Sequence, residues 1–236
     1  MQNAKLLNYL HLHFIVFIWG FTAVLGALIS IDAIPLVWYR MGIAVILVAI
    51  FLGIKQQSFK IGWKFLWQFA FAGVLIAAHW ITFFMAIKAS NVSITLAVLS
   101  TGAFFTSLLE PLFYKRRIIG YEVLFGLLIL IGLYLIFKIN AAYWEGILWA
   151  LISAFLSASF SVLNGKLAPQ FPASLIAVYE LFFGFLAISI YLLLTSGFSH
   201  SFFALQASDW FYLALLASAC TAYAFIASVI YICSSM

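Results

Sequence analysis

Charged side chains are scarce in this chain. Asp, Glu, Lys and Arg make up only 7% of its 236 residues, whereas 67% are hydrophobic and 19% are aromatic. Soluble domains carry roughly 25% charged residues. The composition therefore excludes a soluble domain and indicates an integral membrane protein. The net charge of +5 does not indicate nucleic-acid binding, because the cations are spread over the ends of apolar runs and form no basic face.

Cysteine and recognisable catalytic motifs are also scarce. Cys220 and Cys233 are the two cysteines, and on one helix they would lie roughly 20 Å apart, too far for a disulfide. The chain has no Gly-x-Ser-x-Gly elbow, phosphate-binding loop or histidine box, and the pair His11 and His13 is most simply an interfacial terminus. We therefore expect no enzyme, no cofactor and no metal.

Eight apolar runs bounded by charges, Pro, Gly and aromatic residues predict eight transmembrane helices. The first begins like a signal peptide, but further spans follow it, so we expect it to be retained. Short connections predict that sequential helices are antiparallel neighbours. The predicted helices cover residues 12–31, 35–54, 65–87, 92–113, 119–137, 145–164, 174–195 and 210–232.

The distribution of Lys and Arg predicts the orientation. Eight cations fall on one side of the predicted spans and two, Lys88 and Lys138, on the other, while Arg40 lies inside a span. The N-terminus is therefore expected in the cytoplasm of a multi-pass protein of the cell membrane. The eight are Lys5, Lys55, Lys60, Lys64, Lys115, Arg116, Arg117 and Lys166.

Three segments recur in the same order at nearly equal offsets, which indicates an internal repeat. Residues 67–80 align with residues 210–223 without gaps, at an offset of 143. Tyr39-Arg40 aligns with Tyr179-Glu180 at an offset of 140, and residues 23–26 align with residues 161–164 at 138. The offsets define a first repeat at residues 1–138 and a second at residues 139–236.

The repeat has a geometric consequence. The first unit holds five helices, an odd number, so the second must enter the membrane from the opposite side; such inverted repeats are typical of secondary transporters, whose binding site lies between the halves. The second unit holds only three helices before the sequence ends at Met236. We therefore expect an all-α integral membrane protein with a ten-helix fold cut to about eight helices.

These features resemble a known family. Trp19-Gly20 in the first helix, Tyr39-Arg40 opening the second and Glu110-Pro111 late in the fourth look like the EamA-type permeases of the drug/metabolite transporter superfamily. The resemblance implies an inner-membrane carrier that exports amino acids or related small metabolites by alternating access. Because the last two helices of that family have no counterpart here, the alternative is a truncated, non-transporting protein or one that needs a partner subunit. The expected partners are lipid and a small-molecule substrate, and a homodimer is left open.

Glu110 lies inside or at the edge of a span, where an ionised side chain is costly. It is either a carboxylate that couples transport to a proton or cation, or an interfacial anchor paired with Lys115 or Arg117. Arg40 is either a counter-ion for a substrate carboxylate or a structural residue that snorkels or pairs with a carboxylate. Glu180 is its repeat counterpart near the opposite face, which makes a direct bridge between the two unfavourable.

Other polar and aromatic residues are cavity candidates in the predicted spans. His79 and Trp80 could bind substrate by hydrogen bonding and stacking, with Phe83 on a neighbouring face, or His79 could be satisfied inside the helix bundle. Tyr223 aligns with Trp80 in the repeat, so both could approach one midplane site. Ser100 and Thr101 break the fourth helix and either line a cavity or bond their own helix. Trp19 either packs or faces the cavity, with Gly20 as a helix contact point.

Overall fold

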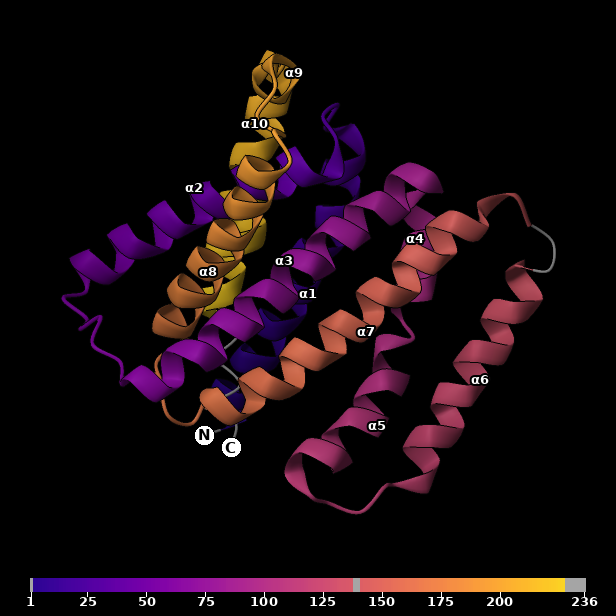
Figure 1. The fold of residues 1–236 in the computed structure, drawn as a ribbon. Helices are drawn as coiled ribbons and strands as arrows, with labels where there is room; N and C mark the ends of the chain where they lie inside the picture. The colour runs from indigo at the N-terminus through magenta and orange to yellow at the C-terminus, as the bar shows by residue number, and fades with distance from the viewer. Residues whose placement is uncertain (1, 138–140, 228–236) are drawn as a thin grey trace. The chain divides into compact units, whose positions relative to one another are not determined.

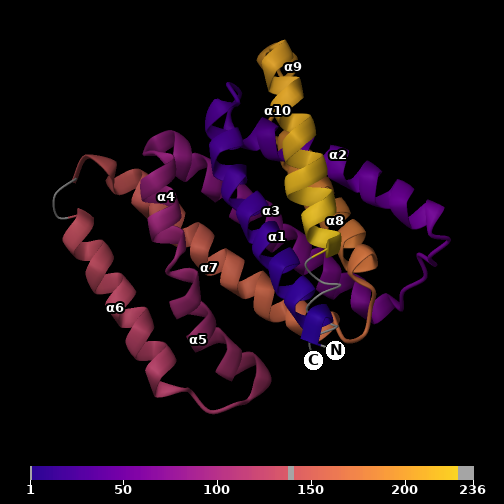
Figure 2. The same ribbon diagram turned by 180° about the vertical axis from the view of Figure 1, so that it is seen from behind.

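The computed structural model describes residues 2–137 and 141–227, and this part of the chain contains helices and short connections but no strand. The predicted all-α membrane fold is confirmed (Figures 1 and 2). The α-helices are α1 (Gln2–Leu28), α2 (Ala33–Ile54), α3 (Trp63–Ala89), α4 (Val92–Leu99), α5 (Gly102–Tyr114), α6 (Gly120–Phe137), α7 (Trp144–Leu167), α8 (Ala173–Leu194), α9 (His200–Phe203) and α10 (Ala207–Ala217), joined by the 3-10 helix η1 (Ala141–Tyr143) and the π-helix η2 (Ser218–Tyr223).

Among the described residues, seven helical segments are long and apolar enough to cross a membrane, and a shorter apolar segment lies at Gly120–Leu135. Together they account for the eight predicted spans. The start of the first is a correction: α1 begins at Gln2, not near residue 12, because the polar residues before the apolar run include no Pro or Gly that would end a helix. Lys138, Cys233 and the predicted end of the last span at residue 232 lie outside the described residues.

The predicted break in the fourth span is confirmed. Helix α4 ends at Leu99 and α5 begins at Gly102. Between them the backbone N–H groups of Ser100 and Thr101 donate to the carbonyls of Ala97 and Val98, three residues back. This is the tighter 3-10 spacing that commonly interrupts α-helices. The two halves therefore count as one span, Val92–Tyr114.

The described chain divides into two compact units. Unit 1 consists of residues 1–77 and 167–236, and unit 2 consists of residues 78–166. Each unit draws segments from both predicted repeats, so the units do not test the repeat boundary at residue 138, which stays a prediction.

Helices α2 and α8 form the main pair of unit 1. Trp38 near the start of α2 donates its ring N–H to Ser189 near the end of α8, at 2.8 Å. At the other end, Gln57 accepts a hydrogen bond from Ser174 at 2.7 Å, so the two helices run antiparallel. Helix α1 packs chiefly on α10. Neighbours in unit 1 are therefore often distant in sequence, whereas in unit 2 the sequential helices α5 and α6 lie side by side, as predicted (Figures 1 and 2).

Helices α3 and α8 come into close backbone contact at Gly73 in unit 1. A Cβ at this position would collide with the carbonyl oxygen of Glu180 and would lie 2.9 Å from the backbone nitrogen of Gly184. Because these obstacles are backbone atoms, only glycine permits the contact. The side chain of Met41 from α2 covers the same crossing.

The connection between α8 and α10 folds back onto the helices of unit 1. Phe202 in the short helix α9 lies with its ring 5.4 Å from that of Trp38 and 5.5 Å from that of Tyr39, measured between centroids. Aromatic pairs at such distances stabilise by about 0.5–1.5 kcal/mol beyond their buried area. No helix is predicted in this stretch from the sequence. Phe202 of α9 is buried against the start of α2, whereas Phe203 is 57% exposed.

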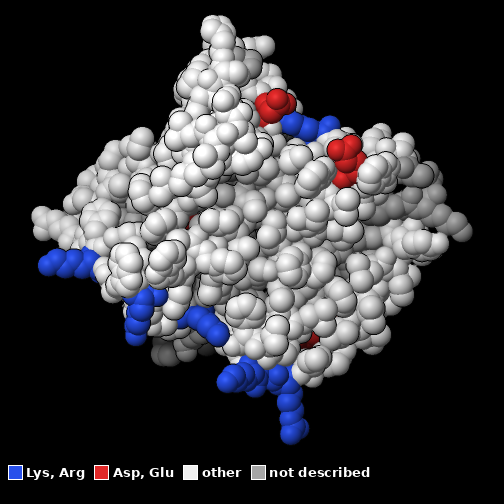
Figure 3. All heavy atoms as spheres, in the orientation of Figure 1, with Lys and Arg blue, Asp and Glu red and all other residues white. Residues whose placement is uncertain are grey.

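In unit 2, α7 packs through small residues. Ala86 from α3, Val98 from α4 and Ala150 from α7 form a fully buried core. Many apolar side chains elsewhere on the spans are exposed, including Phe17 at 62% and Ile46 at 60%. Most of the face drawn in Figure 3 likewise carries no charged side chain. In a membrane protein such a surface contacts lipid.

Candidate functional site

A buried arginine lies at the centre of unit 1. Arg40 on α2 is only 2% exposed, and its Nε–H donates to the hydroxyl of Thr221 at 2.8 Å. The Thr221 hydroxyl is fully buried and in turn donates to the carbonyl of Leu216 at 2.8 Å. Charged groups inside a span are costly and are usually kept for a structural or functional task. The guanidinium therefore does not snorkel to the interface but ties α2 to the last described span.

Thr221 belongs to the π-helix η2, which continues the span for six residues after α10. Its hydroxyl donates to the carbonyl of Leu216, five residues back. Cys220 lies next to it and directs its thiol toward the carbonyl of Ile18 on α1, at 3.6 Å. Such bulges occur frequently at functional sites because they re-aim the side chains that follow.

A carboxylate clamp joins α10 to α1 near the first residues of α10. Asp209 is fully buried. One of its oxygens accepts the backbone N–H of Ser30 at 2.8 Å, and the other accepts the Ser30 hydroxyl at 2.7 Å and the N–H of Gln206 at 3.1 Å. The clamp fixes the distance between the end of α1 and the start of α10.

At the opposite end of the same helices lies a cavity of about 490 Å³. It is formed by α1, α2, η2 and residues 224–227. The phenol of Tyr223 lies 2.9 Å from Nε2 of His11 at its edge. The apolar residues of its lining are Leu47, Phe51, Ala222, Ile226 and Ala227. Arg40 lies seven residues before Leu47 on α2, roughly 10 Å along the helix axis.

In unit 2, His79 is satisfied by α7. Its ring Nδ1 lies 2.9 Å from the carbonyl oxygen of Ser153, and the Ser153 hydroxyl donates to the His79 carbonyl at 3.1 Å. Phe160 packs beside the ring, with centroids 5.6 Å apart. This geometry is that of a histidine satisfied inside the bundle, one of the two alternatives the sequence left open, and its cavity role stays a prediction.

Four other predicted cavity residues lie in unit 2. Trp80 and Phe83 are 4% and 5% exposed. Ser100 is exposed, and its hydroxyl donates to the carbonyl of Ala97 at 2.6 Å. Thr101 is fully buried, and its hydroxyl donates to the carbonyl of Val98 at 2.7 Å. Both hydroxyls therefore bond their own helix.

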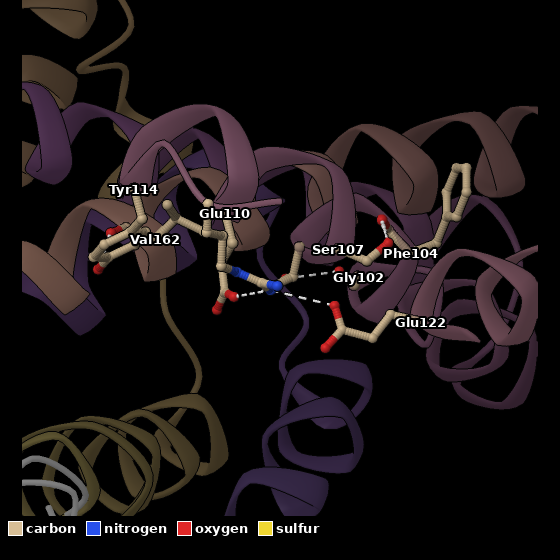
Figure 4. A network of polar contacts seen from close by, with 9 residues as sticks. Gly102, Phe104, Ser107, Glu110, Tyr114, Glu122 and Val162 are labelled. Carbon is tan, nitrogen blue, oxygen red and sulfur yellow. Dashed lines mark hydrogen bonds and ion pairs between the residues drawn. The ribbon is translucent and has the colours of Figure 1, made fainter. Parts of the chain in front are cut away.

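Glu110 forms an ion pair, as one of the two interpretations predicted, but with a different partner. Arg116 donates from one terminal nitrogen to Glu110 at 2.5 Å and to Glu122 of α6 at 3.2 Å (Figure 4). The hydrogen bond to Glu110 is the main reason why the pKa of Arg116 is raised above its ordinary value. Lys115 and Arg117 were the expected partners; instead, Lys115 adopts a left-handed backbone (φ 53°) at the end of α5. That reversal of the chain directs Arg116 back to the carboxylates.

Trp19 is exposed and Glu180 is buried in unit 1. Trp19 is 39% exposed. No described atom lies within 4 Å of a Cβ placed on Gly20, so the prediction that Gly20 is a helix contact point is wrong for the described residues. Glu180 is fully buried on α8, beside the crossing at Gly73.

Sequence reasoning missed several of these contacts. The sequence assigns no role to Thr221 or Asp209 and predicts His11 only as an interfacial residue. Their partners lie 181, 179 and 212 residues away, so no local pattern connects them. One signal was present in the sequence. Arg40 lies inside a predicted span and has no Asp or Glu three or four residues away on the same helix, so it requires a polar partner on another helix.

Comparisons with known proteins agree with the resemblance seen in the sequence. The model of the EamA-like transporter family matches residues 8–138. A protein of known crystal structure superposes with a TM-score of 0.66 at 17% identity, over 94% of this chain and 78% of that one. At this identity the likeness concerns the fold. No curated protein sequence matches the chain.

Proposed function

Because the chain belongs to the EamA-like transporter family, we propose that it is a permease that moves a small polar or amphipathic metabolite, such as an amino acid or a derivative of one, by alternating access. The observation that carries the proposal is the buried hydrogen bond between Arg40 and Thr221. It joins a charged group inside one span to a π-helical turn in another, two features that cost stability and are retained mainly where they serve a task.

Alternating access requires contacts that hold one end of the substrate path closed while the other end opens. The span made of α10 and η2 is held to α1 at both ends, by Asp209 with Ser30 and by Tyr223 with His11. Arg40 holds it near its middle. We propose that this span rocks about the Arg40 contact and that the two end contacts open in turn.

Orientation and direction are part of the same proposal. The excess of cations on one side favours a cytoplasmic N-terminus in the cell membrane, and the family resemblance favours export. The two halves are proposed to be inverted repeats, as Tyr39-Arg40 and Tyr179-Glu180 suggest. A gradient would drive the movement, with Arg40 and Glu180 as the buried candidates for substrate or ion contact, whereas the ion pair of Glu110 favours anchoring.

Counterflow in proteoliposomes tests this function. Vesicles loaded with an unlabelled mixture of amino acids should accumulate a radiolabelled amino acid faster than protein-free vesicles. Arg40→Ala and Thr221→Val should each slow the rate by roughly 10-fold or more, because a hydrogen bond to a charged group contributes about 1.5–3 kcal/mol. The double variant should be no slower than the worse single one, since both remove the same contact.

The matched control is Arg117→Ala, which removes an exposed arginine and should leave counterflow unchanged. Folding of each variant is checked by circular dichroism and by its elution as one peak in size-exclusion chromatography. Absence of accumulation for any amino acid or derivative, with folded and inserted wild-type protein, would count against the transporter proposal.

A further inference from the structure

The cavity beside Tyr223 has the size of a ligand site. Its volume of about 490 Å³ falls within the roughly 300–1,000 Å³ typical of small-molecule pockets. A cavity of roughly 150 Å³ already holds a benzene ring. This one therefore has room for a molecule with two or three rings.

The lining is poor in charge. None of the described lining residues is Lys, Arg, Asp or Glu. A charged ligand would gain no opposite charge from the described wall, so any hydration that it gave up on binding would not be compensated. The composition of the wall therefore selects for an uncharged molecule.

The polar groups of the lining are few and close together. The Tyr223 hydroxyl and the His11 ring nitrogen lie 2.9 Å apart. The Ser218 hydroxyl also belongs to the lining, but it donates to the carbonyl of Ala214 at 2.5 Å. The pair of Tyr223 and His11 can thus offer a ligand one hydrogen-bonding position, with the phenol turning from the imidazole to the ligand.

The rest of the wall suits an apolar body. Phe51, Leu47 and Ile226 present aromatic and branched aliphatic surface. The rings of His11 and Tyr223 lie 6.0 Å apart and are tilted by 40°, and the His11 ring also lies edge-on to Phe14 at 6.5 Å. Aromatic side chains such as Tyr223 and Phe51 favour stacking with a flat ligand.

We propose that this cavity binds an uncharged organic molecule that has an aromatic or branched apolar body and a single hydrogen-bonding group directed at Tyr223 and His11. The inference restricts the ligand of this cavity to uncharged molecules, which excludes free amino acids, and rests on the proposed function only for the claim that the bound molecule is carried. Binding itself is a separate claim with its own measurement.

The test uses the protein in lipid nanodiscs and the fluorescent probe N-phenyl-1-naphthylamine, which is uncharged and has one N–H group. We expect saturable binding above that of empty nanodiscs. The anionic relative 8-anilino-1-naphthalenesulfonate has the same ring system plus a sulfonate, and it should bind at least 10-fold more weakly. Tyr223→Phe should weaken binding of the uncharged probe by roughly fivefold, the contribution of one neutral hydrogen bond.

Two neighbouring substitutions on α2 form a matched pair. Leu47 lines the cavity, whereas Ile46 is 60% exposed and does not belong to the lining. Leu47→Trp should fill the cavity and weaken binding at least 10-fold, and Ile46→Trp should leave it unchanged. Thermal unfolding of both variants establishes that the comparison is between folded proteins.

Equal weakening by the two tryptophan variants, or equal binding of the anionic and uncharged probes, overturns the inference. Displacement of the probe by a short-chain phosphatidylcholine at submicellar concentration would identify a lipid site and would also overturn it. Counterflow of amino acids without probe binding would refute this inference and leave the transporter in place. Probe binding without any counterflow would support the cavity assignment and refute the proposed function.

Discussion

Polar side chains in unit 1 bond across helices that are far apart in sequence, as Ser30 does to Asp209 and Arg40 to Thr221. In unit 2 most of the spans' hydroxyls bond the carbonyls of their own helix, as those of Thr82 and Thr101 do. The link between His79 and Ser153 is an exception. A bond within one helix leaves that helix able to turn, whereas a bond between two helices fixes how they face each other.

This difference in hydrogen bonding determines which helix displacements break contacts between helices. In unit 1 a displacement of α10 must exchange several hydrogen bonds together, so its positions should be few and distinct. In unit 2 the packing depends mainly on apolar and small residues such as Ala86 and Ala150. Substitutions at the interhelical contacts of unit 1 should therefore cost more than matched substitutions in unit 2, and the predictions below test this from the largest effect to the smallest.

The largest effect is expected at the helix crossing of unit 1. Gly73→Ala should lower the free energy of unfolding by about 3 kcal/mol, because the added methyl group meets the backbone of α8 and overpacking of this kind forces helices apart. The change in the free energy of unfolding is measured by unfolding in mixed micelles at increasing mole fractions of sodium dodecyl sulfate.

Gly132→Ala on α6 of unit 2 is the control for that experiment. No described atom lies within 4 Å of a Cβ there, so the variant should be neutral or stabilised by up to about 1 kcal/mol through helix propensity. Equal destabilisation by the two variants would contradict the assignment of a close crossing at Gly73.

The carboxylate clamp should give the next largest effect. Asp209→Asn replaces one carboxylate oxygen, which accepts hydrogen bonds, by an NH₂ group, which donates them. This NH₂ group would face the donors of Ser30 and Gln206, so the free energy of unfolding should fall by about 2 kcal/mol. Asp32→Asn is the control, because Asp32 is exposed and its side chain makes no capping bond. Thermal unfolding in nanodiscs compares them, and a loss no greater for Asp209→Asn than for Asp32→Asn would show that the clamp does not hold α1.

A smaller effect is expected at the interhelical contact of unit 2. Ser153→Ala removes the hydroxyl of α7 that contacts both the ring nitrogen and the carbonyl of His79 on α3, and it should lower the free energy of unfolding by about 1 kcal/mol. Ser159→Ala, also on α7, removes a hydroxyl that bonds its own helix at the Phe155 carbonyl and should change stability little. If the two serine variants unfold at the same temperature, the contrast between the two kinds of hydrogen bond fails.

The smallest effect is expected at Glu110. Glu110→Gln weakens a partly exposed ion pair with Arg116, and such pairs contribute little to stability. Counterflow measured between pH 5 and 8 should therefore have the same pH dependence as in the wild type. A shift of the pH optimum would instead assign Glu110 to coupling.

Much of the fold was predictable because the hydrocarbon core of the membrane dictates the composition and length of each span. Spans must be apolar and about 20 residues long, so hydropathy located all eight, and two hydroxyl residues followed by glycine located the break after Leu99. The start of α1 was not predictable in this way, because a helix can continue into water where hydropathy gives no signal. The inverted repeat stays a prediction.

The candidate site was predictable only in part. Arg40 and Glu110 stood out because a charge in a span needs a reason. Their partners did not, since Thr221 approaches Arg40 only through the packing of two distant spans. For Glu110 the choice among three adjacent cations depended on the left-handed backbone of Lys115, a conformation that lysine rarely adopts and that the sequence does not indicate.

The π-helix at Ser218–Tyr223 is equivalent, in genetic terms, to the insertion of a single codon into an α-helix. Each residue added to a regular helix turns everything after it by roughly 100°. The wider π-helical turn absorbs that rotation, so deletion of Ala219 would let the turn close to an α-helix while Tyr223 and Ile226 keep facing the cavity wall that they now form. Deletion of a residue from the regular helix after Tyr223 would instead rotate Ile226 by roughly 100°.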